Sequence, residues 1–201
     1  MIKGTLFVVS APSGCGKGTI LKEVFKDADK IYYSVSATTR APRDEDTDGV
    51  TYHFMTKDGF ESLIRNDGFL EYAEYCGNYY GTPKAPVMEK LENGCDVVLE
   101  IETIGAFNVK EAYPEAVMIF ILPPSLKELK RRLLKRGTES LKVVDKRIER
   151  ARDEILLADR YDYILINDGL EKAVEDFKNI CSIAKTKVNR NKIINEVLEN
   201  A

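Results

Sequence analysis

The sequence is poor in the residues that most metal centres and hydrolytic triads require. Its 201 residues include a single histidine, His53, and four cysteines that form no C-x-x-C pair. Metal sites built on histidine clusters and triads with their own histidine therefore have almost no material here, and a zinc site is not expected. Since the cysteines also stand far apart, we expect four free thiols in a reducing cytoplasm: Cys15, Cys76, Cys95 and Cys181.

An excess of basic charge and long apolar segments are missing as well. Thirty lysines and arginines stand against 33 aspartates and glutamates, for a formal net charge of −3, which argues against a globally basic nucleic-acid binder. The apolar run Val117–Leu122 is far too short to span a membrane. The brief apolar run at 6–9 ends in a glycine-rich loop, unlike a signal peptide. We expect a cytoplasmic protein that binds neither membranes nor nucleic acid.

What the sequence does contain is the pattern of a globular α/β protein. Apolar residues make up 44% and charged residues 31%, enough for a core in one domain or at most two. Continuous short apolar runs predict strands covered on both faces, and helical patterns between them predict a five-stranded parallel sheet. The predicted strands are 5–10, 31–36, 96–101, 117–122 and 163–166, and the predicted helices are 18–27, 84–93, 126–136 and 170–187.

Two segments break this alternation. Residues 38–82 are rich in tyrosine, glycine, aspartate and threonine, and they predict a small antiparallel insert on the main sheet. Its strand segments are 50–55, 69–75 and 78–81, with a short helix at 58–66. Residues 126–152 carry eleven lysines and arginines against four acidic residues and predict two helices joined near Gly137, a basic helical lid.

The most informative segment joins the first strand to the first helix and reads S-A-P-S-G-C-G-K-G-T at 10–19. In this context a glycine-rich loop is typical of a P-loop, whose backbone N–H groups and helix N-terminus hold phosphate oxygens while Lys17 reaches the β- and γ-phosphates. Cys15 could be a low-pKa thiol near that N-terminus or a loop residue without catalytic use. The candidate ATP-binding residues are Ala11, Pro12, Ser13, Gly14, Cys15, Gly16, Lys17, Gly18 and Thr19.

This loop departs from the P-loop consensus in two places. Ala11 stands where the first glycine is usual, and Gly18 stands where serine or threonine usually holds Mg²⁺. The hydroxyl of Thr19, one position later, can replace the missing one. The G-K-G-T variant resembles that of the nucleoside monophosphate kinases, in which Mg²⁺ can rely more on substrate phosphates and water.

Further motifs make the resemblance more specific. They are S-V-S-A-T-T-R-A-P-R at 34–43, G-V-T-Y-H-F at 49–54, F-L-E-Y-A at 69–73, G-N-Y-Y-G-T at 77–82, V-L-E-I-E at 98–102, P-P-S at 123–125, R-G-T at 136–138 and N-D at 167–168. In this order and spacing they resemble guanylate kinase, a family of P-loop nucleoside monophosphate kinases, over roughly residues 4–185. Many members carry aspartate where this chain has Glu100 and Glu102, and glutamine where it has Ile104.

The resemblance implies a P-loop NTPase fold with a three-layer core, a small mixed-β GMP-binding insert and a helical lid. The kinase domain would span 4–184, followed by a helical tail at 185–201. Within it the core would comprise 4–33, 83–125 and 159–190, the insert 34–82, and the lid 126–158.

The resemblance also assigns residues to the two nucleotides. Guanine presents N–H donors at N1 and N2, so carboxylates beside hydroxyls suit it, and guanidinium groups suit the GMP phosphate. Lid arginines would neutralise charge on the transferred phosphoryl group together with Lys17 and Mg²⁺. The implied GMP-binding residues are Ser36, Arg40, Arg43, Tyr52, Glu71, Tyr80, Thr82 and Glu100; the lid residues are Arg132, Arg136 and Arg147; Asn167 would contact adenine, and Thr19 and Glu102 could contact Mg²⁺.

The expected activity is phosphorylation of GMP, and of dGMP, by Mg·ATP, which yields GDP and ADP in purine nucleotide metabolism and GMP recycling. Two alternatives remain open at this point. One is a non-catalytic module like the guanylate kinase-like domains of membrane-associated scaffold proteins, which bind phosphopeptides. The other is a kinase for a different nucleotide or small metabolite. The chain could act as a monomer or a homo-oligomer.

Overall fold

The computed structural model describes residues 3–27, 31–75, 77–135 and 140–186. The chain forms two compact units, the first made of residues 3–8 and 30–116 and the second of residues 9–29 and 117–201. The predicted joint near Gly137 and the predicted tail beyond residue 186 lie outside the described residues. Among the helices of the described ranges, none is long and apolar enough to cross a membrane.

Five strands form the predicted parallel sheet, in the order β2-β7-β1-β8-β9. All of β1 and the first five residues of β8 are buried, as expected of strands covered on both faces. The edge strand β9 differs, because Ile164 and Ile166 are exposed on either side of the buried Leu165. The strands are β1 (Leu6–Ser10), β2 (Ile31–Ser34), β7 (Asp96–Glu100), β8 (Val117–Leu122) and β9 (Tyr163–Ile166).

The first unit also contains a second sheet of four strands, in the order β4-β3-β6-β5. The segment forms a sheet of its own rather than an addition to the main sheet. It is mixed, as the family resemblance implies, and not purely antiparallel, because β3 and β4 run parallel whereas β6 is antiparallel to β3 and β5. Strand β3 has only two residues, too few to show a periodic pattern. The strands are β3 (Ala37–Thr38), β4 (His53–Phe54), β5 (Phe69–Tyr75) and β6 (Asn78–Pro83).

Aromatic side chains form the core of this second sheet. Helix α2 (Lys57–Arg65) carries Phe60, which is fully buried and stacks on Phe69 at 4.2 Å and on Tyr79 at 5.3 Å between ring centroids. The hydroxyl of Thr56 caps the helix by accepting from the backbone N–H of Gly59. The tyrosine-rich composition of this segment is therefore explained partly by packing.

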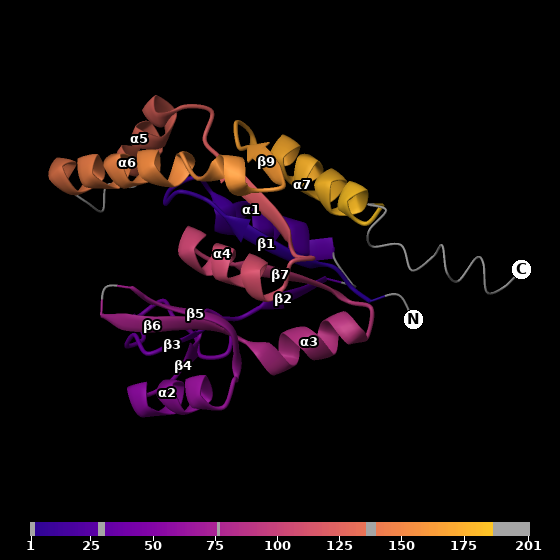
Figure 1. Ribbon diagram of the computed structural model, residues 1–201. Coiled ribbons are helices and arrows are strands. Elements are labelled where there is room, and N and C mark those ends of the chain that lie inside the picture. The colour runs from indigo at the N-terminus through magenta and orange to yellow at the C-terminus, as the bar shows by residue number, and fades with distance from the viewer. Residues whose placement is uncertain (1–2, 28–30, 76, 136–139, 187–201) are drawn as a thin grey trace, which may run out of the picture. The chain divides into compact units, whose positions relative to one another are not determined.

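Two further helices belong to the first unit (Figure 1). Helix α3 (Lys84–Glu92) ends where predicted, with Gly94 just beyond it at a positive φ of 76°. Helix α4 (Thr103–Ala112) is absent from the sequence prediction. Its buried residues include the polar Thr103, while the apolar Ile104 next to it is exposed. The segment therefore lacks the separate apolar and polar faces by which a helix is predicted from sequence.

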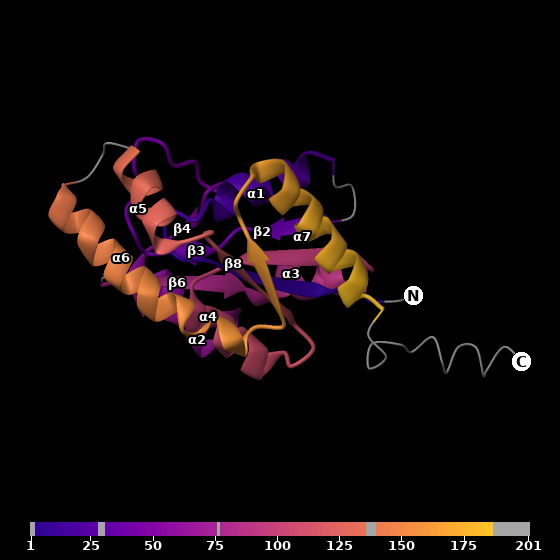
Figure 2. The ribbon, with the colours of Figure 1, turned by 90° about the horizontal axis from the view of Figure 1, so that it is seen from above.

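The second unit contains the helices that accompany the glycine-rich loop and the basic segment. The helical predictions for this unit are confirmed within a few residues at their ends. Helices α5 and α6 lie side by side in both views (Figures 1 and 2), as do α1 and α7. The helices are α1 (Lys17–Val24), α5 (Leu126–Lys135), α6 (Leu141–Ile155) and α7 (Leu170–Ala184), with short 3-10 helices at Phe25–Asp27 and Ala158–Arg160.

Candidate active site

In the second unit the glycine-rich loop runs from the end of β1 to the start of α1, as the P-loop prediction requires. Gly14 and Gly16 have φ values of 95° and 87°, which L-residues with a side chain rarely adopt. Gly16 is the N-cap residue, and Lys17 begins the helix with its side chain half-buried. The loop therefore presents the backbone turn and helix N-terminus that bind phosphate groups.

The two glycines are also needed because neighbouring side chains lie against them. A Cβ on Gly14 would lie 2.7 Å from Cδ2 of Leu133 in α5, and a Cβ on Gly16 would lie 2.7 Å from the side-chain nitrogen of Asn167. Real Cβ atoms essentially never show contacts this short. The loop is thus packed against α5 on one side and against the residue that follows β9 on another.

Asn167 is engaged with the loop backbone. Its buried side-chain amide donates to the backbone carbonyl of Cys15 at 2.7 Å. The backbone carbonyl of Asn167 accepts from the guanidinium of Arg132 at 2.9 Å. The structure thus shows an amide that holds the phosphate-binding loop, while the adenine contact that the resemblance implies for Asn167 stays a prediction.

The described lid arginines belong to the same network. Arg132 in α5 also donates to Glu128, one turn earlier, at 2.8 Å. Arg147 in α6 donates to the hydroxyl of Ser13 in the loop. Hydrogen bonds from Arg131 and Arg132 lower the pKa of Glu128 to about 2, so the carboxylate is charged at neutral pH. The third predicted lid residue, Arg136, lies outside the described residues.

Cys15 is not a reactive thiol in this structure. Its side chain is completely buried, and that burial raises its pKa to about 12 despite nearby Arg132 and Lys17. A buried thiol that stays protonated at neutral pH is inert. The alternative of a loop residue without catalytic use is therefore favoured. Cys15, Cys95 and Cys181 form no disulfide with one another, and Cys76 lies outside the described residues.

In the first unit, two predicted tyrosines and one carboxylate gather around Arg40. The Arg40 guanidinium lies 5.4 Å from the ring centroid of Tyr52, and the rings of Tyr52 and Tyr80 meet edge to face at 5.9 Å. Asp46, which sequence reasoning missed, accepts from the Arg40 guanidinium at 2.8 Å and from the backbone N–H of Arg43 at 2.8 Å. These contacts hold Arg40 in place, whereas the Arg43 side chain is exposed.

The cluster combines hydrogen-bond donors for an anionic ligand with one charged carboxylate that fixes the guanidinium. Burial and the neighbouring Tyr80 raise the pKa of Tyr52, so its hydroxyl remains a neutral donor. The backbone N–H of Arg43 and the guanidinium of Arg40 lower the pKa of Asp46, which therefore stays charged. A planar guanidinium beside a neutral hydroxyl is a donor arrangement that fits phosphate oxygens.

The predicted base-reading carboxylates also lie in the first unit. Glu71 on β5 is buried, and its Oε1 accepts from the hydroxyl of Thr82 on β6 at 2.7 Å. Burial raises the pKa of Glu71, against the hydrogen bonds from Thr82. At the end of β7, Oε2 of Glu100 accepts from the hydroxyl of Tyr33 at 2.9 Å. The fourth predicted residue, Ser36, is half-buried between β2 and β3.

Tyr33 is a further residue that sequence reasoning missed, although it lies within a predicted strand. Burial and the charge of Glu100 both raise the pKa of its hydroxyl. Tyr33 is therefore a permanent hydrogen-bond donor to Glu100 at neutral pH. The only available signal was its place in the strand 31–36, which says nothing about a partner 67 residues away.

The oxygen donors proposed for Mg²⁺ are accessible. Thr19 is exposed in the first turn of α1, and Glu102 is exposed as the N-cap residue of α4. Among the described residues no three histidine, cysteine or acidic side chains form a metal-binding group. Because Mg²⁺ prefers oxygen ligands and usually keeps several waters beside substrate phosphates, one oxygen from Thr19 in the second unit, or one from Glu102 in the first, fits an ion held mainly by a nucleotide.

Comparison with known proteins identifies the family. The guanylate kinase family model matches residues 3–184. A curated guanylate kinase of Thermus thermophilus is 50% identical over 200 residues, covering 100% of this chain and 89% of the relative. One from Clostridioides difficile is 52% identical over 192 residues, covering 96% and 94%.

A solved structure agrees with the sequence relatives. The guanylate kinase from Anaplasma phagocytophilum is 32% identical and superimposes with a TM-score of 0.80, covering 98% of this chain and 94% of that one. The family expected from the motifs is therefore confirmed, and so is the α/β fold with its parallel sheet and mixed second sheet. The chain belongs to the guanylate kinase family.

Proposed function

We propose that this chain is a guanylate kinase that transfers the γ-phosphoryl group of ATP to GMP and releases GDP and ADP. The observation that carries the proposal is the intact phosphate-binding loop, with Lys17 at the start of α1, in a chain of this family. A module that only binds ligands needs no such loop. The proposed setting is purine nucleotide metabolism in the cytoplasm.

The reaction needs positioning and charge neutralisation rather than a strong base. The second pKa of a phosphate monoester is about 6, so the attacking GMP oxygen is already ionised near pH 7. As that oxygen bonds to the γ-phosphorus, the bond to the β–γ bridging oxygen breaks, and ADP leaves with the electron pair. This demand fits a chain with a single histidine, His53, which is exposed on β4.

On the donor side, we assign the ATP phosphates to the loop at 11–19. Lys17 neutralises charge on the β- and γ-phosphates, and Arg132 and Arg147 stabilise the transition state from the two lid helices. Mg²⁺ bound to the phosphates would supply further charge neutralisation, with Thr19 or Glu102 as added oxygen ligands. Arg136 is assigned to the lid by family resemblance alone.

On the acceptor side, we assign the GMP phosphate to the cluster of Arg40, Arg43, Tyr52 and Tyr80. The guanine base is assigned to Glu71 and Glu100, with Ser36 and Thr82. Carboxylates accept from guanine N1–H and N2–H, whereas adenine has an acceptor at N1, so each charge would remain unpaired against it. Such a mismatch can reduce the rate by roughly 10⁴-fold. None of the assigned contacts reads the ribose 2′-hydroxyl, so dGMP is a second acceptor.

The decisive experiment is an acceptor panel. The purified chain is supplied with Mg·ATP and, in turn, GMP, dGMP, AMP, UMP and dTMP, and ADP formation is followed. We expect turnover with GMP and dGMP and little with the others. The Lys17→Ala variant controls for contaminating kinases and should lose at least about 100-fold in kcat, as expected when charge stabilisation is removed from the transition state.

Two results would reject the proposal. A preference for AMP would contradict the base-reading role of the carboxylates. Absence of turnover with every acceptor, together with retained binding of phosphopeptides, would favour the scaffold-type binding module.

A further inference from the structure

Gly105 in helix α4 lies directly against the carboxylate of Glu71. A Cβ on Gly105 would lie 2.7 Å from Oε2 of Glu71 and 3.3 Å from its carboxyl carbon. Real Cβ atoms essentially never approach as closely as the first distance. Both residues are buried and both belong to the first unit. Any side chain at position 105 would therefore need the space that the carboxylate occupies.

The local backbone does not explain a glycine at this position. Gly105 lies within α4, and it is not among the glycines with positive φ. In the interior of a helix, glycine is less favourable than alanine. The local cost has a tertiary cause, because the nearest atoms that a side chain would meet belong to Glu71.

The carboxylate has little freedom to move away. Its other oxygen, Oε1, accepts a 2.7 Å hydrogen bond from the hydroxyl of Thr82. Moving the group would lengthen or break this bond within a buried environment, where an unsatisfied charge is costly. A methyl group at position 105 would therefore displace the Glu71 carboxylate rather than fill an empty space.

We propose that Gly105 is a positioning residue for the acceptor base: its missing side chain sets where the Glu71 carboxylate stands, and thereby sets the affinity for GMP. The inference rests on the proposed function, in which Glu71 reads guanine. Gly105 itself need not touch the nucleotide. It acts through the carboxylate, so its effect depends on the length of the side chain at position 71.

The contact itself is tested by a double-mutant cycle in thermal unfolding, without any nucleotide. Gly105→Ala is made in the wild-type chain and in the Glu71→Asp background, where the shorter side chain withdraws the carboxylate by one methylene. We expect Gly105→Ala to lower Tm in the wild-type background. In the Glu71→Asp background it should leave Tm unchanged or raise it, since alanine favours the helix. Equal Tm shifts in both backgrounds would show that the side chains at positions 105 and 71 do not interact, and would overturn the inference.

The functional role is tested by steady-state kinetics with GMP and ATP varied separately. Gly105→Ala should raise the KM for GMP by at least about tenfold, because small misplacements of a recognition group are costly. The KM for ATP and kcat should stay within about twofold of the wild-type values, which is within the range of neutral substitutions. The matched control is Asn108→Ala, an exposed position of the same helix, which should leave both KM values unchanged.

The outcomes separate this inference from the proposed function. A wild-type KM for GMP in Gly105→Ala, or an equal loss of affinity for both nucleotides, would overturn the positioning role while wild-type turnover with GMP upholds the function. If the wild-type chain did not phosphorylate GMP, the proposed function would fail, and the positioning role would fail with it even if the Tm cycle showed coupling.

Discussion

The side-chain amide of Asn167 holds the carbonyl of Cys15, 152 residues earlier in the chain, at 2.7 Å. The amide thus stabilises the backbone of the phosphate-binding loop. It occupies the space that a side chain at position 16 would need, and this position is a glycine. Because both amide and carbonyl are buried from solvent, the loss of the donor would leave the carbonyl unsatisfied. The conformation of the loop therefore depends on the residue that follows β9.

Asn167→Ala should weaken the binding of the donor nucleotide through the loop. A buried carbonyl that loses its donor costs about 1–3 kcal/mol, so we expect the KM for ATP to rise by roughly five- to a hundredfold and Tm to fall. The KM values for ATP and for GTP as phosphoryl donors should rise by the same factor, because the loop contacts the phosphates that the two nucleotides share. Selective loss of the preference for ATP would show instead that Asn167 contacts adenine. Measuring KM for both donors decides between the two.

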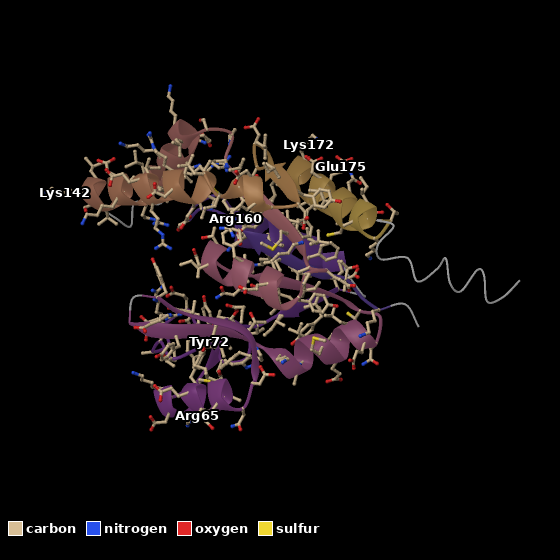
Figure 3. All side chains as sticks on the ribbon, viewed as in Figure 1. Arg65, Tyr72, Lys142, Arg160, Lys172 and Glu175 are labelled. Carbon is tan, nitrogen blue, oxygen red and sulfur yellow. The ribbon has the colours of Figure 1, made fainter. Side chains whose placement is uncertain are left out.

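Arg40→Ala should act mainly on the acceptor. A hydrogen bond to a charged group contributes about 1.5–3 kcal/mol, so the KM for GMP should rise by roughly ten- to a hundredfold, with little change in the KM for ATP. Arg40→Lys should rescue poorly, because lysine cannot keep both the Asp46 contact and the planar stacking on Tyr52. Arg65→Ala, at the exposed end of α2 (Figure 3), is the matched control. Unchanged GMP affinity in Arg40→Ala would contradict the phosphate assignment.

The raised pKa of Glu71 predicts a pH dependence of GMP binding. Burial moves this pKa above the ordinary glutamate value of about 4.3. The charged form accepts from guanine, so the KM for GMP should rise as the pH falls through the raised pKa. In Glu71→Gln the KM should be higher near neutral pH and should lose this acidic dependence. An identical acidic profile in the variant would assign the effect to another group.

The same shift predicts how stability changes with pH. Because the folded-state pKa of Glu71 lies above the unfolded value, the folded protein binds more protons in that interval. The stabilising contribution of the neutral carboxyl is thus fully present below the unfolded pKa and is lost as the pH rises through the folded one. Denaturant unfolding at several pH values should show the wild-type protein losing stability relative to Glu71→Gln as the pH rises. The opposite slope would contradict the burial argument.

Cys15 should resist alkylation in the folded protein. With a pKa of about 12 and a fully buried side chain, it offers almost no thiolate at neutral pH. Peptide mapping after treatment with iodoacetamide should find Cys15 unmodified in the native chain and modified after unfolding in urea. The half-buried Cys95 serves as an internal comparison. Rapid modification of Cys15 in the native chain would contradict the burial of this thiol.

The sequence alone was sufficient for features whose determinants are local. The main strands and the helices α1, α3 and α5 follow from apolar runs and periodicity, and the phosphate-binding loop follows from glycines between a strand and a helix. Helix α4 was not predictable in this way, because the exposed Ile104 places an apolar residue on the solvent face while the polar Thr103 is buried. In the second sheet, β5 and β6 were predictable in the same way, but β3 was not, since a two-residue strand forms only through its neighbours.

The tertiary structure decided how the candidate residues are held. Glu100 could be named from its motif, but its donor Tyr33 lies 67 residues away, and nothing in either segment indicates the other. Nothing in the sequence around Gly105 indicates a special role, because its contact with Glu71 appears only in the folded structure. Hydrogen bonds and excluded volume depend on distances in space, whereas sequence patterns report only on neighbours along the chain. The identities of the candidate groups were therefore encoded locally, and their placement was settled by folding.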